Sequence, residues 1–251
     1  VLVFITLTAW LRSEGLDLSV IGFFGWITLT YSLKFLWAPF VDRFSIPVLS
    51  IIGSRRSWIL LMQIIILISL IFISLIDPTY NLLIFAIVAL IIAFAGSIQD
   101  IAIDAYRIES APLEDQGNLA AGYQFGYRIS ILVGSSLSLL IADAHSWPIA
   151  YQSMALIIAL NVLWSFAISL VEKTVTLVQL KHINSVVEPL KDFFERFGIK
   201  LASMLLLIVA TYRLTDIVMG PMANPFYIDL GYTLSEIGYV KVVALIATII
   251  G

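Results

Sequence analysis

The chain of 251 residues is 61% hydrophobic and only 12% charged, and its mean hydropathy is +1.02. A soluble domain is roughly 50% apolar and about 25% charged, so this composition excludes one and indicates an integral membrane protein. The absence of cysteine excludes disulfides, thioether-linked haem and zinc–thiolate sites, while the net charge of −3 says little about partners.

Eight helical spans are predicted in chain order. Nineteen residues, 58–76, carry no charge and no period-2 alternation, which favours helices over barrel strands, because about twenty helical residues cross a bilayer core. We therefore expect an all-α polytopic membrane protein. Because apolar runs reach both ends, we also expect a fragment of a longer polypeptide. The expected spans are 1–11, 21–40, 58–76, 82–106, 119–142, 149–171, 201–220 and 237–251.

The predicted orientation follows from the Lys and Arg residues of the loops, because positive charge is retained on the cytoplasmic side. Loops after odd-numbered spans hold only Arg12. The loops after even-numbered spans, which should therefore face the cytoplasm, hold nine basic residues: Arg43, Arg55, Arg56, Arg107, Lys173, Lys181, Lys191, Arg196 and Lys200.

The longest loop, 172–200, carries mixed charge and separates six spans from the two that follow. We divide the chain into an N-terminal half (1–171), a cytoplasmic linker (172–200) and the start of a C-terminal half (201–251). An amphipathic stretch at 187–197, interrupted only by Pro189, predicts a surface helix in the linker. A solvated connector is favoured over a binding role for it.

An eight-residue pattern occurs twice at an offset of 216 residues: 15–22 and 231–238 both read G-x-x-L-S-x-I-G. A serine before an apolar run is also a common N-cap, so the match has a purely local explanation too. The equal position at the second span of each half favours an internal repeat. Two parallel halves of six spans are the architecture of major facilitator transporters, so this chain would cover about eight of twelve helices.

Three ionisable residues lie within or at the end of the fourth span. Asp100, Asp104 and Arg107 fall at i, i+4 and i+7, on one face of an α-helix. A carboxylate near the bilayer centre costs about 2.5 to 3.5 kcal/mol on insertion scales, so this face must meet partners or water. Asp100 is a candidate proton carrier, because burial disfavours the ionised form. Asp104 with Arg107 is better explained as an ion-pair latch between helices.

Cations near the middle of the membrane are candidates for binding an anionic substrate. Arg128 has no acid within one helical turn, so it needs a partner on another helix or on a ligand. Gln124 and Tyr127 lie beside it, and Lys34 has Tyr31 at i−3. Arg128 is the leading candidate for substrate contact.

Two further sets of charged residues have more than one interpretation. Arg213 and Asp216, at i and i+3 on the seventh span, either neutralise each other or take part in substrate binding and proton coupling. Lys241 lies on the last span and receives no role, because lysines near helix ends commonly snorkel.

Four stretches together resemble the AmpG muropeptide permeases, a family of major facilitator proteins. They read YSLKFLWAPFVDR at 31–43, GSRRSW at 53–58, QDIAIDAYR at 99–107 and GYR at 126–128. Residues 42–43 and 53–56 resemble the superfamily's D-R-x-G-R-R loop motif, split here by nine residues. One departure is the Ser-Ile pair at 97–98, where the family more often has Ala-Thr.

This resemblance implies proton-driven uptake of N-acetylglucosaminyl-anhydromuramyl peptides from periplasm to cytoplasm, across the bacterial inner membrane, for cell-wall recycling. Midplane cations suit the ligand's carboxylates, and aromatic faces suit its sugars. We expect a monomer with no cofactor, metal or nucleic-acid partner. The candidate site residues are Tyr31, Lys34, Gln99, Gln124, Tyr127, Arg128 and Arg213 for substrate, Asp100, Asp104 and Asp216 for the proton, and Asp42, Arg43, Arg55, Arg56 and Arg107 for gating.

Other functions remain open at this stage. Similarity to acetyl-CoA transporters is weaker, and their ligand is anionic too. A membrane-embedded acyl or glycosyl transferase would need clustered catalytic groups, whereas His145 and His182 lie in an outer loop and in the linker without metal-ligand spacing. A homologue that has lost transport and acts as a sensor or scaffold is a third possibility.

Overall fold

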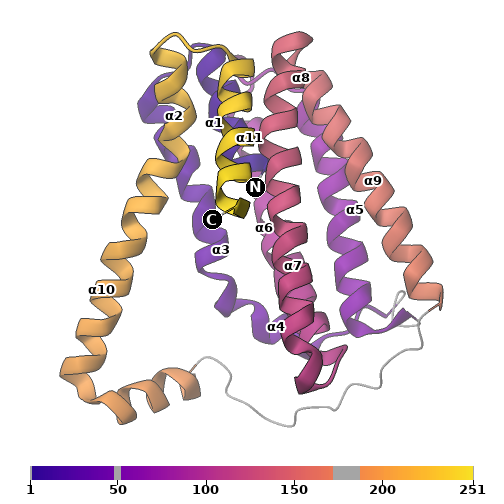
Figure 1. Cartoon of the computed structure of the whole chain (residues 1–251), viewed down its shortest axis with the longest axis vertical. Helices are drawn as coiled ribbons and strands as arrows, with labels where there is room; N and C mark the ends of the chain where they lie inside the picture. The colour runs from indigo at the N-terminus through magenta and orange to yellow at the C-terminus, as the bar shows by residue number, and fades with distance from the viewer. Residues whose placement is uncertain (1, 48–51, 172–186, 251) are drawn as a thin grey trace.

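The computed structural model describes residues 2–47, 52–171 and 187–250, and every regular element within them is helical. The helices run side by side along the long axis of the molecule (Figure 1). The predicted all-α class is confirmed. The elements are α1 (Leu2–Ser13), α2 (Leu18–Gly25), η1 (Trp26–Thr28), α3 (Leu29–Ser32), η2 (Lys34–Leu36), α4 (Ala38–Arg43), α5 (Ser54–Ser74), α6 (Leu82–Glu109), η4 (Leu113–Asp115), α7 (Gln116–Ile131), η5 (Leu132–Leu137), α8 (Ser138–Ala144), α9 (Trp147–Val171), α10 (Val187–Asp229) and α11 (Leu234–Ile250).

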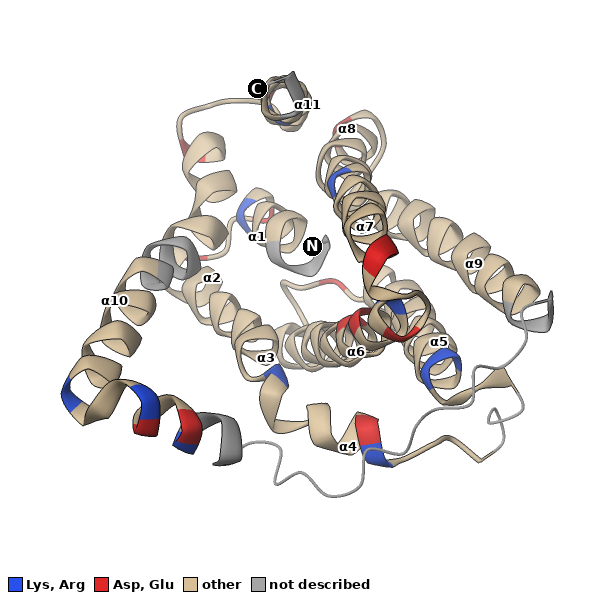
Figure 2. Ribbon diagram, turned by 60° about the horizontal axis from the view of Figure 1, so that its bottom comes forward, with Lys and Arg blue, Asp and Glu red and all other residues tan. Residues whose placement is uncertain are grey.

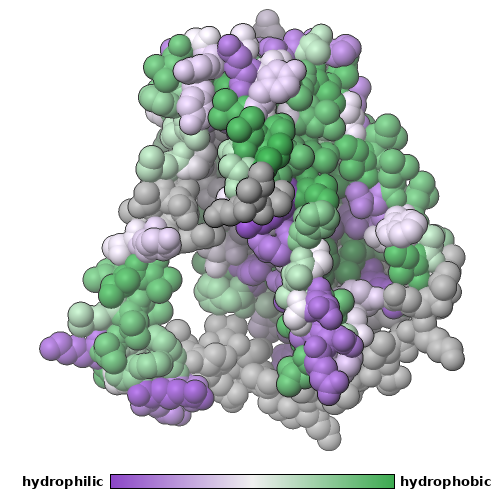
Figure 3. Space-filling view, in the orientation of Figure 1, coloured by the Kyte–Doolittle hydropathy of each residue, from purple (hydrophilic) through white to green (hydrophobic). Residues whose placement is uncertain are grey.

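Among the described residues, five stretches are long and apolar enough to cross a membrane, and they coincide with the predicted second to sixth spans. Hydrophobic side chains predominate on the face shown in Figure 3, and hydrophilic ones gather at the lower ends of α7 and α10. The protein is therefore a multi-pass membrane protein. The five stretches are Leu18–Leu36, Ser54–Ser74, Leu82–Glu109, Leu113–Ala144 and Trp147–Ile168.

The two ends of the bundle differ in charge. We call the end that holds the turns after α1, α5, α8 and α10 the outer end, and the opposite end the inner end, following the predicted orientation. Figure 2, which brings the inner end forward, shows basic and acidic residues on α4, α5 and the lower part of α10. The helix directions thus bring the described members of the predicted cytoplasmic set to one end.

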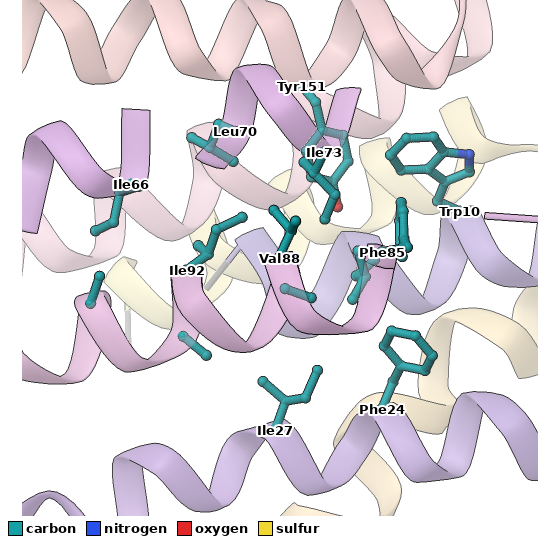
Figure 4. Packing of buried hydrophobic residues seen from close by; sticks show 14 of the residues in the cluster. Trp10, Phe24, Ile27, Ile66, Leu70, Ile73, Phe85, Val88, Ile92 and Tyr151 are labelled. Atoms are coloured by element: carbon teal, nitrogen blue, oxygen red, sulfur yellow. The ribbon is translucent and has the colours of Figure 1, made fainter. Parts of the chain in front are cut away.

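The core is centred on aromatic residues from three helices. Trp10 of α1 packs edge-on against Phe85 of α6 and lies 5.0 Å, between ring centroids, from Tyr151 of α9 (Figure 4). Trp147 stacks on Trp10, with ring centroids 5.9 Å apart. Tyr151 is completely buried, and its hydroxyl hydrogen-bonds to that of Thr6 at 3.3 Å. These contacts fix α1 to α6 and α9.

The second span is not the continuous helix that we predicted over 21–40. The α-helix α2 stops at Gly25, and the chain continues through the 3₁₀ turn η1, the single α-helical turn α3 and the 3₁₀ turn η2 to α4, which has Pro39 in its first turn. Proline lacks an N–H and its ring clashes with the carbonyl four residues earlier, so it fits a helix start but interrupts a continuing helix. The prediction treated the apolar run as uniform and gave Pro39 too little weight.

The fifth span was also predicted as one regular helix, over 119–142. The structure inserts the π-helical segment η5, whose Gly134, Ser135 and Ser136 are buried. The Ser135 hydroxyl donates to the carbonyl of Ile131 at 2.6 Å, and such back-bonding commonly distorts helices.

The first stretch of the predicted linker, 172–186, lies outside the described residues. Residues 187–197 are helical, as the amphipathic pattern predicts, and continue into the next span at a kink where Gly198 has φ +69°. The seventh span extends to Asp229, beyond the predicted 220, although it contains Pro221 and Pro225.

The two copies of the repeated pattern adopt the same turn. Gly15 and Gly231 have φ values of +81° and +89°, a left-handed conformation that favours glycine. Each ends its helix in a Schellman motif, with the glycine N–H bonded to the residue three positions back and the next N–H to the residue five back. The repeat therefore extends from sequence to local geometry.

Candidate functional site

The interruption of the second span positions a lysine against the fourth span. Lys34 begins the 3₁₀ turn η2, and its ammonium donates to Asp100 Oδ2 on α6 at 2.6 Å. Asp104, one turn further along α6, lies 3.6 Å from the same nitrogen. The predicted carboxylate stripe thus finds its partner on a segment 66 residues earlier.

A tyrosine on α7 completes this group. The Tyr123 hydroxyl donates to Asp100 Oδ1 at 3.2 Å, so the two oxygens of Asp100 serve two different partners. We call Lys34, Asp100, Asp104 and Tyr123 the Lys34 cluster. With one cation and two carboxylates, the cluster carries a net charge of −1 when both acids are ionised. An additional proton or cation would neutralise it.

Two aromatic side chains of the second span, Tyr31 and Trp37, pack against α6 within two turns of Asp100. The Tyr31 hydroxyl lies so close to Gly96 of α6 that a Cβ there would displace it. Trp37 donates its indole N–H to the Ser97 hydroxyl at 3.1 Å and packs on Phe94. The serine that departs from the family pattern is therefore used to hold Trp37.

The latch predicted from Asp104 and Arg107 is arranged differently. Asp104 faces Lys34, whereas the Arg107 guanidinium lies over the Tyr123 ring, 5.3 Å from its centroid. The buried Nε of Arg107 has no hydrogen-bond partner among the described residues. Tyr123 therefore links the Lys34 cluster to a second cation through its ring.

Arg128 lies at a contact between the two predicted halves. Its Nη1 donates to the backbone carbonyl of Thr248 on α11 at 3.4 Å, and no ion pair of Arg128 is found in the part of the chain described. Gln124 and Tyr127 are exposed on α7, and Gln99 is half-buried on α6. The side chains of the other two candidates, Arg213 and Asp216, lie outside the described residues.

The predicted gating residues form two groups at the inner end. Arg55 of α5 bonds to Asp42 of α4 at 2.6 Å and to Glu109 of α6 at 2.9 Å, so it joins three helices. Arg56 is buried and donates to the Tyr106 hydroxyl at 3.2 Å, also lying over its ring. These contacts all lie within the first 171 residues. Arg43 ends α4 and is exposed.

Sequence reasoning did not place Tyr123, Trp37 and Ser97 among the site residues. One signal was available for the first two, because tyrosine and tryptophan in a span need a partner for their polar atoms. Ser97 carried no such signal, since its role depends on the broken second span.

The sequence profile described as "Major Facilitator Superfamily" matches residues 2–251. The chain is 36% identical over 258 residues to the protein named "Putative transporter AmpG 4" of Rickettsia conorii, covering 100% of the chain and 62% of that protein. It is also 36% identical over 250 residues to the "Anhydromuropeptide permease" of Escherichia coli K12, covering 98% of the chain and 49% of that protein.

The chain therefore spans between about half and two thirds of the length of these relatives. The resemblance predicted from the four motif stretches is confirmed by them, and none of these names describes an enzyme. Because the profile match extends over nearly the entire sequence, the chain belongs to the Major Facilitator Superfamily.

Proposed function

We propose that the intact protein is a proton-coupled symporter that imports anhydromuropeptides from the periplasm to the cytoplasm of a bacterium. The permease name of one relative supports the substrate class. The observation that carries the coupling is the Lys34 cluster, in which one ammonium is shared by two carboxylates. In such a group, a proton that binds to one carboxylate frees the ammonium to bind a carboxylate of the ligand, so the total charge stays balanced.

The coupling follows from the charge of the cluster. With both carboxylates ionised, Lys34 is held by Asp100 and the net charge of −1 repels an anionic ligand. Protonation of Asp100 removes one negative charge and weakens its hold on the ammonium. Lys34 can then bind a ligand carboxylate, so proton binding favours substrate binding. Release of the proton on the cytoplasmic side restores the Lys34–Asp100 pair and expels the ligand.

Arg128 supplies a second contact in this proposal. It lies on α7 and already reaches the C-terminal part of the chain through Thr248. Its planar guanidinium suits bidentate binding of a peptide carboxylate. Trp37 and Tyr31, which pack against α6 near the Lys34 cluster, suit the apolar faces of the sugars.

The test uses the full-length protein in vesicles with an imposed proton gradient and labelled anhydromuropeptide. Asp100→Asn mimics a permanently neutral residue, so we expect loss of accumulation against a gradient while ligand exchange persists. Asp77→Asn is the matched control. Asp77 lies in the turn between α5 and α6, and hydrogen bonds from Thr79 hold its pKa below its usual range. Full proton-driven accumulation by Asp100→Asn would overturn the coupling role.

Ligand competition separates the main alternative. Acetyl-CoA is also anionic, and a transporter of that ligand would take up labelled acetyl-CoA and not labelled muropeptide. We expect unlabelled anhydromuropeptide to compete and acetyl-CoA to have no effect. Uptake of labelled acetyl-CoA without uptake of labelled muropeptide would show that acetyl-CoA is the substrate instead.

A further inference from the structure

The outer end contains polar contacts that the proposed transport site does not use. Arg12, in the last turn of α1, donates its Nε–H to Asp229 Oδ1, in the last turn of α10, at 2.5 Å. The Ser235 hydroxyl, in the first turn of α11, donates to Asp143 Oδ2 near the end of α8 at 2.5 Å. Each contact joins an element of the N-terminal half to one of the C-terminal half.

Arg12 is fixed firmly within its own half. Trp10, two residues earlier, is buried against α6 and α9, and Ser13 accepts the indole N–H of Trp147 at 2.7 Å. Arg12 also donates to the carbonyl of Leu16 at 3.1 Å, across the turn that Gly15 makes possible. A separation of the two halves at this end must therefore break the contact with Asp229, because α1 cannot follow α10.

Asp229 and Asp143 both need a partner for an electrostatic reason. Each lies at the C-terminal end of a helix, where the carbonyl dipoles place partial negative charge and disfavour a carboxylate. The Arg12 cation offsets this repulsion at α10, and the Ser235 hydroxyl offsets part of it at α8. Without these contacts, both helix ends would be left with uncompensated negative charge.

Below these contacts, α10 packs on the N-terminal half near its outer end. A Cβ on Gly25 of α2 would lie 3.3 Å from Pro221 Cγ, so the two backbones are close there, and Met222 lies against Gly22. Asn224 donates to the carbonyl of Ile5. Towards the inner end, residues 206–209 and Tyr212 of α10 are exposed, and this part of α10 stands apart from α3 and α4 (Figure 1).

We propose that Arg12–Asp229 and Asp143–Ser235 form an outer latch that closes the transport path on the outer side while the inner end is open. Latch residues lie at both repeated G-x-x-L-S-x-I-G turns: Arg12 closely precedes the first turn, and Asp229 closely precedes the second. Opening towards the outside breaks both contacts. This inference rests on the two-half architecture of the superfamily and not on the identity of the substrate.

The test measures access from the outside in the full-length protein. Met222→Cys places a thiol between α2 and α10, below the latch, and right-side-out vesicles are treated with a membrane-impermeant maleimide. Arg12→Asp and Asp229→Arg should each raise the labelling rate by about fivefold or more, the population change equivalent to about 1 kcal/mol. The double charge reversal Arg12→Asp/Asp229→Arg should return the rate close to that of Met222→Cys alone.

The matched control is Lys191→Glu, which also reverses one charge. Lys191 pairs only with Glu195 on the same exposed helix in the described structure, so labelling should stay unchanged. Arg12→Gln and Asp229→Asn repeat the test if a charge reversal prevents folding. Unchanged or slower labelling in the single variants would overturn the latch. A double variant that labels as fast as the singles would overturn it too, because that indicates local distortion. Since no substrate is added, these outcomes are independent of the muropeptide proposal.

Discussion

Lys34→Met should destabilise the folded protein more than a change to either carboxylate beside it. The ammonium lies 2.6 Å from Asp100 and 3.6 Å from Asp104, so its removal leaves two acids one turn apart on α6 without a cation between them. Removing one partner of a buried pair costs about 3 to 5 kcal/mol. Because these side chains are 29 to 38% exposed, we expect about 2 to 3 kcal/mol here.

The structure also predicts the order of the remaining variants. Asp100→Asn leaves Asp104 within reach of the ammonium and should cost about 1 to 2 kcal/mol. Asp104→Asn keeps the shorter contact and should cost least. Lys34→Met/Asp100→Asn should be more stable than Lys34→Met alone, since it removes one of the two uncompensated charges.

The assay is thermal unfolding of the full-length protein in detergent, followed by tryptophan fluorescence. A control cycle on Lys191 and Glu195, which are 71% and 66% exposed, should give a coupling of no more than about 0.5 kcal/mol. Two results would refute the reasoning: a Lys34→Met protein as stable as wild type, or a double variant whose loss equals the sum of the single losses.

Three further changes test other parts of the site. Arg128→Lys keeps the charge but loses the planar guanidinium, so muropeptide binding should weaken about tenfold or more, because a hydrogen bond to a charged group contributes roughly 1.5 to 3 kcal/mol. Equal losses of affinity for the peptide-free disaccharide in a binding titration would instead indicate a structural role for Arg128. Gly96→Ala should displace the Tyr31 hydroxyl and lower muropeptide uptake, whereas Gly126→Ala, where a Cβ meets open space, should leave uptake unchanged. Equal uptake by the two variants would contradict the tight contact between Gly96 and Tyr31. Asp42→Asn removes one of two carboxylates from Arg55, so cysteine accessibility from the inner side should change while substrate preference in competition assays does not.

Much of the fold could be predicted from the sequence because bilayer physics acts locally. A membrane-spanning helix needs about twenty apolar residues and makes its backbone hydrogen bonds within itself. The uncharged run of α5 and the long apolar run of α6 can therefore be recognised as spans without knowledge of the neighbouring helices. The repeated pattern beginning at Gly15 and Gly231 likewise encodes a turn that depends on a few adjacent residues. The spacing of Asp100 and Asp104 on one helix face predicted that this face of α6 contacts polar groups.

The partners of that stripe were decided only by the tertiary structure. Lys34 reaches Asp100 from the 3₁₀ turn η2, at the interruption of the second span before Pro39, which the apolar pattern of the span did not predict. Tyr123 joins the cluster because α7 packs beside α6, which no local pattern specifies. Arg12 meets Asp229 across 217 residues. Helix rotation and mutual depth arise from packing between distant segments, so the sequence determined which groups needed partners, and the fold determined which partners they received.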